Sequence, residues 1–332
     1  MKNNVPSLPR SYEKVNYLLR PRKQIERKIL IDIFKRVRDI HTYHYIGLGS
    51  IFYYDFILFH KYLNIKKMTS LDDKETVKRF NFNKPYDFIA FVSKKTTEFL
   101  EENEFRPKVI IWFDYDSMLY DYKNEEKNES ILKDIEIITY RAVPLTFFLL
   151  TVDIRCPRER KPQDRFRHQF ESYLPSEYKD DIYIIDNEKF FSDYKYMIQS
   201  IILNSIEEQQ KFQEIKFHKL FSFFYRDTAP MYTLGGVYET VDGFKSLMNQ
   251  FSNNEFINSE KNYITDIDVP ILTYKEKIYL DSIIKRLQLA ARNEADLERI
   301  IGNLHFEIGT PEMLEKYIKY YRYYPQYYEG II

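Results

Sequence analysis

Short apolar runs alternate with amphipathic stretches through the first half of the chain. Five runs have the length and the apolar content of strands that are covered on both faces of a parallel sheet. These predicted strands are residues 43–46, 67–71, 87–92, 108–113 and 145–152. Amphipathic periodicity predicts helices before and between them, over residues 22–38, 50–62, 96–101 and 130–140. Alternating strands and helices with short connections predict an α/β fold, with a mostly parallel sheet flanked by helices.

The pattern changes after the fifth predicted strand. Residues 155–168 are basic and interrupted by proline, which predicts a loop, and residues 194–218 predict a long helix. The runs 221–225 and 231–238 predict an antiparallel pair that closes the sheet. Polar spacers and amphipathic helices follow. We therefore expect a helical amino-terminal segment packed on the core, an α/β core, and a small carboxy-terminal helical appendage, at residues 1–40, 41–244 and 245–332.

A pair of glycines follows the first predicted strand. The chain has only 8 glycines in 332 residues, yet Gly47 and Gly49 stand one residue apart, before an apolar helical run. Backbone without a Cβ atom can press against a ligand, and the amino end of a following helix offers free N–H groups. We expect Gly47, Gly49 and Ser50 to bind a cofactor. The alternative is that the glycines serve the turn alone.

An acidic pair follows the second predicted strand. Nucleotide-binding α/β folds place the carboxylate that binds ribose hydroxyls at this position. Asp72 fits the end of the strand better, whereas Asp73 could cap the next helix. Asp55, directly behind the glycines, is a further candidate for cofactor contact or for a helix cap. Glycine turn and acid together predict a site for a nucleoside-containing cofactor.

Three aspartates stand at the ends of the fourth and fifth predicted strands. Asp114 and Asp116 follow the fourth strand, and Asp153 follows the fifth. Neighbouring carboxylates are costly unless they pair with a cation, share a proton or stay solvated, which indicates a functional role as proton acceptor. A bolder interpretation places a divalent cation on Asp114 and Asp153, because hard cations prefer oxygen ligands. The cation is the minor alternative.

Basic side chains crowd the start of the first predicted helix. Cations at a helix start oppose the helix dipole, so their presence there favours a role in binding an anionic substrate. The alternative is an ordinary solvated face. The candidate substrate-binding residues are Arg20, Arg22, Lys23 and Arg27.

Composition restricts the classes of protein. The 50 basic and 50 acidic residues give a formal charge of zero, which disfavours a protein that mainly coats nucleic acid. The single cysteine, Cys156, excludes disulfides within the chain and a Cys-based zinc site. Neither a secretory signal nor a membrane-spanning apolar run is visible, so we expect a cytoplasmic globular protein without a membrane partner. The oligomeric state is not encoded in any visible pattern.

The order of these elements resembles a class I, Rossmann-like S-adenosylmethionine-dependent methyltransferase. The counterparts are the Gly47-Leu48-Gly49 turn, Asp72, the segment Asp114-Tyr115-Asp116 and the closing strand pair. Several segments look like a bacterial family labelled putative O-methyltransferases, namely residues 17–28, 47–60, 79–85, 112–116 and 231–237. The chain departs from many class I enzymes because no acid stands just before the turn and no third glycine follows it.

The resemblance implies an enzyme that moves a methyl group from S-adenosylmethionine to an oxygen, or alternatively a nitrogen, of an unidentified small-molecule or macromolecular acceptor. Residues 41–244 would be the Rossmann-like methyltransferase core. The cofactor would lie at the glycines and Asp72, and the acceptor at Asp114 and Asp116. Two other classes stay open. One is a non-catalytic Rossmann-like module that binds a nucleotide or a partner, and the other is a nicotinamide-dependent oxidoreductase, whose cofactor uses a similar turn and acid.

Overall fold

The computed structural model describes residues 20–73, 77–121, 129–179 and 187–325. Contacts between residues divide the chain into two compact units. Of the described residues, unit 1 contains 31–224 and 229–265, and unit 2 contains 20–30, 225–228 and 266–325.

Unit 1 is built on an eight-stranded sheet with the order β3-β2-β1-β4-β5-β7-β6-β8. Strands β3, β2, β1, β4 and β5 pair in parallel, and β7 pairs with β5 in antiparallel orientation. The predicted parallel sheet with an antiparallel closing strand is therefore confirmed. The strands are β1 (His44–Leu48), β2 (Lys67–Leu71), β3 (Ile89–Val92), β4 (Val109–Met118), β5 (Thr146–Asp153), β6 (Lys216–Arg226), β7 (Pro230–Glu239) and β8 (Thr265–Ile267).

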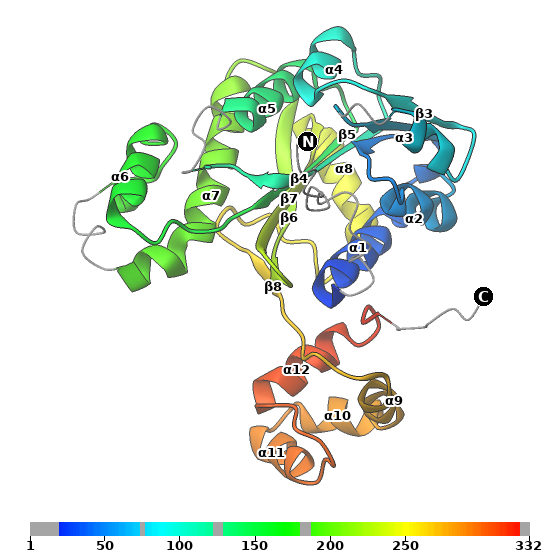
Figure 1. Ribbon diagram of the computed structural model, residues 1–332, viewed down its shortest axis with the longest axis vertical. Helices are drawn as coiled ribbons and strands as arrows, with labels where there is room; N and C mark the ends of the chain where they lie inside the picture. The colour runs from blue at the N-terminus through cyan, green and yellow to red at the C-terminus, as the bar shows by residue number, and fades with distance from the viewer. Residues whose placement is uncertain (1–19, 74–76, 122–128, 180–186, 326–332) are drawn as a thin grey trace, which may run out of the picture. The chain divides into compact units, whose positions relative to one another are not determined.

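Helices follow most strands of the sheet and connect the parallel ones (Figure 1). The boundary between the two units falls within α1, and four further helices belong to unit 2. The helices that precede these four in the chain are α1 (Pro21–Phe34), α2 (Tyr54–Leu63), α3 (Val77–Asn83), α4 (Thr96–Glu102), α5 (Glu129–Arg141), α6 (Arg160–Gln169), α7 (Asn187–Gln209) and α8 (Val241–Met248). Those of unit 2 are α9 (Tyr274–Ser282), α10 (Ile284–Ala290), α11 (Glu294–Gly302) and α12 (Pro311–Tyr320).

Side chains of β4 enter two different layers of unit 1. Ile111 and Phe113 belong to a core that also contains the buried face of α5 and α7. Trp112 lies on the other face, with its ring centroid 5.9 Å from that of Phe59 in α2. Successive side chains of a strand point to opposite faces. The end of β4 therefore presents polar side chains to both layers.

Several predicted elements differ from the structure, and three of the differences have a clear physical reason. The helix after the glycines begins at Tyr54, because Tyr53 has a left-handed backbone with φ 47° and precedes it as the cap. The predicted basic loop contains α6, in which Pro162 stands in the first turn, where its missing N–H costs no hydrogen bond. The predicted helix over 194–218 ends at Gln209, and β6 begins at Lys216 because this segment joins the sheet.

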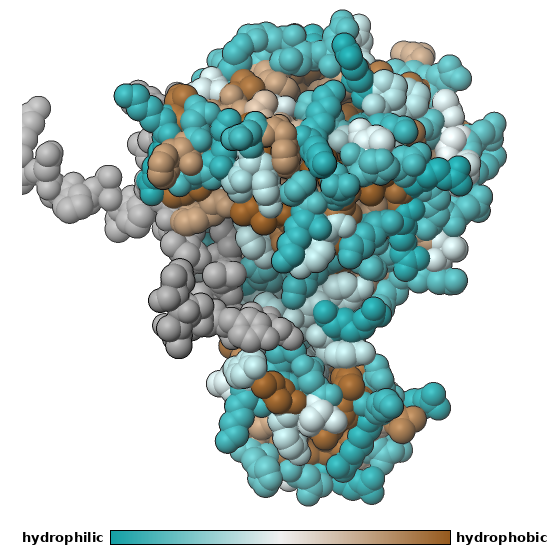
Figure 2. Space-filling model, turned by 90° about the vertical axis from the view of Figure 1, so that its right-hand side faces the viewer, coloured by the Kyte–Doolittle hydropathy of each residue, from teal (hydrophilic) through white to brown (hydrophobic). Residues whose placement is uncertain are grey.

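The surface is predominantly hydrophilic on the face that Figure 2 shows, with hydrophobic side chains scattered among polar ones. Scattered apolar residues are usual on a surface in contact with water. No helix within the described residues is long and apolar enough to span a membrane.

Candidate functional site

The carboxyl ends of β2, β1 and β4 meet at one edge of the sheet. Gly47 is paired in register with both neighbouring strands. Continuing the register of β1 with β2 places Gly49 beside Asp72, whereas the pairing of β1 with β4 ends at Gly47 and Trp112, two residues before Asp114. Asp72 and Asp114 each stand two residues beyond a partner of Gly47, an even spacing that places both side chains on one face of the sheet.

This edge combines main chain with carboxylates of different exposure. The Gly49 N–H donates to the carbonyl of Leu71 at 2.8 Å, which continues the pairing of β1 with β2. Asp72 is 9% exposed, Gly49 and Asp114 are half-buried, and Asp116 is exposed. The predicted cofactor acid is thus sheltered, and the predicted acceptor acids face increasingly toward solvent.

The space beside both glycines is filled by side chains of the same chain. A Cβ atom on Gly47 would lie 2.4 Å from the Tyr45 hydroxyl, and one on Gly49 would lie 2.1 Å from Ser70 Oγ. Gly47 also lies inside β1 rather than in a turn. The expectation that these glycines leave backbone bare for a ligand is therefore wrong in its physical reason, because the glycines make room for Tyr45 and Ser70. Their contact with a cofactor stays a prediction.

Ser50 and Asp55 have roles in the local structure. Ser50 Oγ accepts a hydrogen bond from the Phe52 N–H at 3.3 Å, within the turn that leads to α2. The Tyr53 hydroxyl donates to the carbonyl of Phe80 at 3.1 Å and so ties this turn to α3. Asp55 is half-buried in the first turn of α2, where a carboxylate stabilises the helix amino end. The proposed cofactor contacts of Ser50 and Asp55 stay predictions.

The register of β4 with β5 separates two of the acids. Asp114 is opposite Thr151, and after a shift Met118 is opposite Asp153. Asp114 and Asp153 are therefore not an opposed pair, and the register gives no support to a cation held between them. Within the described residues, no group of three His, Cys, Asp or Glu side chains is arranged to hold a metal ion.

Asp153 is the buried acid at the end of β5. It is 4% exposed, accepts the Arg155 N–H at 2.9 Å and forms an ion pair with the Arg155 side chain at 2.8 Å. Burial raises the pKa of the Asp153 carboxyl, the hydrogen bonds and charge of Arg155 oppose this rise, and the charge of Asp116 adds to it. A carboxyl with a raised pKa at a strand end is a candidate for proton transfer.

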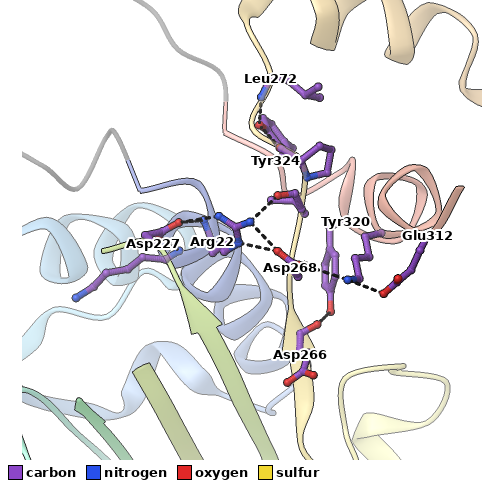
Figure 3. A network of polar contacts seen from close by, with 12 residues as sticks. Arg22, Asp227, Asp266, Asp268, Leu272, Glu312, Tyr320 and Tyr324 are labelled. Carbon is purple, nitrogen blue, oxygen red and sulfur yellow. Dashed lines mark hydrogen bonds and ion pairs between the residues drawn. The ribbon is translucent and has the colours of Figure 1, made fainter. Parts of the chain in front are cut away.

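In unit 2, Arg22 is engaged by carboxylates of the chain (Figure 3). Its Nη2 donates to Asp268 Oδ1 at 2.6 Å, its Nε to the same oxygen at 3.0 Å, and its Nη1 lies 3.6 Å from Asp227 Oδ1. Asp227 also accepts the main-chain N–H groups of Arg22 and Lys23, at 3.3 and 3.0 Å. Asp227 therefore caps α1 from a segment 205 residues away.

The other basic residues of this segment are also largely covered. Arg27 is 1% exposed and lies 3.2 Å from the Glu26 carboxylate, and Lys23 is 6% exposed. Arg20 is half-buried. Together with the ion pairs of Arg22, this burial contradicts the alternative of a solvated basic face. The role of Arg20, Arg22, Lys23 and Arg27 in substrate binding stays a prediction.

On the other face of β4, one buried carboxylate is bonded to several hydroxyl groups, and the sequence analysis did not predict this network. Asp134 of α5 is 2% exposed and accepts hydrogen bonds from Thr97 at 2.5 Å, from Tyr115 at 2.5 Å and from Thr96. Burial raises the pKa of Asp134, and the three hydroxyl donors oppose this rise only in part. Its place on the apolar face of an amphipathic helix was the signal that could have revealed it.

Unit 1 also contains two cavities that lie away from the strand edge with Asp72 and Asp114. One of about 540 Å³ is lined by residues of α4, α5 and α7 and the end of α6, and one of about 310 Å³ by residues of α7, β6 and α8. Neither is lined by a predicted site residue.

The fold and the acids at its edge define the class of the protein. A mostly parallel sheet with an antiparallel closing strand, and carboxylates after β2 and at the end of β4, is the arrangement of a Rossmann-like methyltransferase. The sequence profile of the family described as "Putative O-methyltransferase" matches residues 15–332. The chain belongs to this family.

Several solved structures are similar to this chain at low sequence identity. The S-adenosylmethionine-dependent methyltransferase SibL, in its apo form, aligns with 9% identity and a TM-score of 0.35, over 65% of this chain and 55% of that chain. The N-methyltransferase NodS from Bradyrhizobium japonicum WM9 aligns with 8% identity and a TM-score of 0.34, over 65% and 97%. Human N-acetylserotonin methyltransferase aligns with 8% identity and a TM-score of 0.33, over 66% and 56%.

These similarities are too distant to carry an inference about activity or substrate. The matched region spans little more than half of the SibL and human chains. No protein of curated function matches this chain in sequence.

Proposed function

We propose that this protein is an S-adenosylmethionine-dependent methyltransferase that acts on an oxygen of its acceptor, with nitrogen as the alternative. Family membership supports the reaction class. The observation that carries the proposal is the strand edge at which Asp72, Gly49 and Asp114 stand near the carboxyl ends of three neighbouring parallel strands. In open α/β sheets, ligands bind in the crevice outside the carboxyl ends of the strands.

The residues at this edge fit such a cofactor. The sheltered Asp72 carboxylate offers acceptors for ribose hydroxyls, next to the half-buried main chain of Gly49 and Ser50. When bound, the cofactor supplies an electrophilic methyl group whose bond to sulfur breaks as the bond to the acceptor forms, with the electron pair left on sulfur.

The acids of β4 would act on the acceptor. Asp114 is half-buried and Asp116 exposed, two residues apart near the end of the strand, so either carboxylate can take the proton that the acceptor atom loses. The rest of the catalytic effect would come from holding the two reactants in line and excluding water.

Binding of S-adenosylmethionine and S-adenosylhomocysteine tests the proposal directly. Trp112 is the only tryptophan of the chain and lies two positions before Asp114, so its fluorescence should report binding, with calorimetry as an independent measurement. We expect Asp72→Asn to weaken binding about tenfold, the loss of one charged hydrogen-bond acceptor. Asp73→Asn is the matched control, because Asp73 is exposed and should leave binding unchanged. A folded wild-type protein that binds neither compound would contradict the proposal.

A second experiment separates the packing role of Gly49 from a cofactor role. Gly49→Ala should weaken binding and lower stability by about 2 kcal/mol, because the new methyl group overlaps Ser70 Oγ. In Gly49→Ala combined with Ser70→Ala, that oxygen is gone and stability should largely recover. If cofactor binding does not recover with it, the backbone at Gly49 contacts the ligand. Recovery of both would show that Gly49 serves packing alone.

The packing against both glycines also favours the second candidate, a module that binds a nucleotide without catalysis. It predicts that Asp114→Asn and Asp116→Asn leave the biological phenotype intact. Loss of the phenotype in either variant that keeps cofactor binding would favour the enzyme.

A further inference from the structure

The segment that follows Asp114 and carries Tyr115 and Asp116 is not held by regular strand pairing. The register between β4 and β5 shifts between Asp114 and Met118, so the ladder that orients the earlier part of β4 is interrupted there. Irregularities of this kind re-aim side chains and require other contacts to fix them. Any side chain that anchors this segment therefore influences where the Asp116 carboxylate points.

Tyr115 is that anchor. It stands between the two acids in β4, and its side chain packs against the core on the face of α5 and α7, opposite to the face of Asp114. Its hydroxyl donates to Asp134 Oδ2 at 2.5 Å and lies 3.4 Å from Thr96 Oγ1. The end of β4 is thereby tied to α5 and α4.

The Asp134 carboxylate accepts hydrogen bonds from hydroxyl groups of two elements. It is 2% exposed and accepts hydrogen bonds from Thr96 and Thr97 of α4 as well as from Tyr115 of β4. No ion pair of Asp134 with a lysine or arginine is found among the described residues. Bonds from hydroxyls to a buried carboxylate are short and directional, so this arrangement fixes the geometry more than it offsets the cost of burying a charge.

We infer that Asp134, acting through Tyr115, is a positioning residue that fixes the direction of the Asp116 carboxylate, near Asp114, at the proposed methyl-transfer site. The inference rests on the proposed function. It predicts that loosening Tyr115 changes the ratio of the affinities of the site for a positively charged ligand and for its uncharged counterpart. A role in stability alone predicts no such change.

Two variants that each remove one hydroxyl donor from Asp134 make the test. Tyr115→Phe removes the donor that belongs to β4, and Thr97→Val removes one of equal length that belongs to α4. Both should lower thermal stability to a similar extent. S-adenosylmethionine carries a positive sulfonium that S-adenosylhomocysteine lacks, so the ratio of their affinities measures the carboxylates that face the bound ligand. Trp112 fluorescence gives both dissociation constants in each variant.

We expect Tyr115→Phe to reduce the preference for S-adenosylmethionine by about threefold, a modest loss of charge interaction in a partly solvated site. Thr97→Val should keep the wild-type ratio. Equal ratios in both variants, with binding intact in the wild type, would overturn the inference and leave the proposed function standing. If the wild type binds neither compound, the proposed function fails and the inference fails with it.

Asp134→Asn is a second variant in case Tyr115→Phe does not fold. The amide keeps the shape of the side chain but presents one oxygen instead of two to the three hydroxyls. A folded Asp134→Asn protein should show the same reduced ratio. An unchanged ratio would overturn the inference.

Discussion

The two units use buried or partly buried carboxylates in opposite ways. In unit 2, Asp268 is bonded to Arg22 at 2.6 Å and to Lys316 at 3.0 Å (Figure 3). In unit 1, Asp134 is more deeply buried but is bonded to hydroxyl groups. The first arrangement neutralises charge, and the second leaves a carboxyl whose charge the surroundings do not favour.

The pKa shifts of the two residues differ in sign for this reason. Partial burial by itself raises the pKa of Asp268, but the hydrogen bonds and charges of Arg22 and Lys316 together lower it. Burial raises the pKa of Asp134, and hydroxyl donors do not reverse the rise. Carboxyls with raised pKa values gather at functional sites, whereas cation-paired carboxylates more often serve structure. In unit 1 this second kind of carboxyl is bonded to Tyr115 of β4, next to the acids of the proposed site.

The largest expected effect is the loss of a structural carboxylate in unit 2. Asp227→Ala removes the acceptor of two main-chain N–H groups at the start of α1 and leaves Arg22 with one carboxylate fewer. We expect a loss of about 3 kcal/mol of unfolding free energy, from the missing cap and the less compensated charge. Urea unfolding followed by circular dichroism measures it.

Asp242→Ala is the control for that variant. The Asp242 side chain is 94% exposed in its ion pair with Lys245, and such surface pairs contribute little. Stability losses of equal size in the two variants would contradict the structural role of Asp227.

A smaller effect is expected in the pH dependence of stability. The contributions of the two kinds of carboxylate to stability should change in opposite directions as the pH changes. The pKa of Asp268 is lowered in the folded state, so its contribution is present above its ordinary pKa of about 4 and is lost as pH falls. The pKa of Asp134 is raised, so its contribution is greatest below that value and declines as pH rises through the interval up to the raised pKa.

Asparagine variants isolate these contributions, because an amide does not titrate. Asp268→Asn should therefore lose its disadvantage relative to wild type as pH falls below about 4, whereas Asp134→Asn should improve relative to wild type as pH rises above that value. Trp112 fluorescence follows unfolding of unit 1, and circular dichroism follows the whole chain. Parallel pH profiles for the two variants would refute the contrast between the units.

Much of the sheet was predictable because its signal is local. The strand over 67–71 was placed without error, and the acids that follow β2 were found directly after it. β4 is longer than predicted, because Asp114 and Asp116 continue the strand beyond its apolar run. Apolar content marks only the buried part of a strand, so a polar extension at a functional edge gives no signal of its own.

The residues that surround the candidate site were harder to predict, since their partners are distant in sequence. Tyr45 and Gly47 stand two positions apart on one strand, and their contact could have been inferred from strand alternation. Nothing local indicated that Ser70 would fill the space beside Gly49. Such contacts depend on the register between strands.

The amino-acid sequence by itself determined the alternation of strands and helices, the acids near the strand ends and the family of the protein, because periodicity and motif spacing are read within short windows. The tertiary structure alone decided that Gly49 lies beside Asp72, that Asp227 caps α1 and that Asp134 holds Tyr115. Strand register and the packing of distant segments bring these groups together, and neither is encoded in any one stretch of the chain.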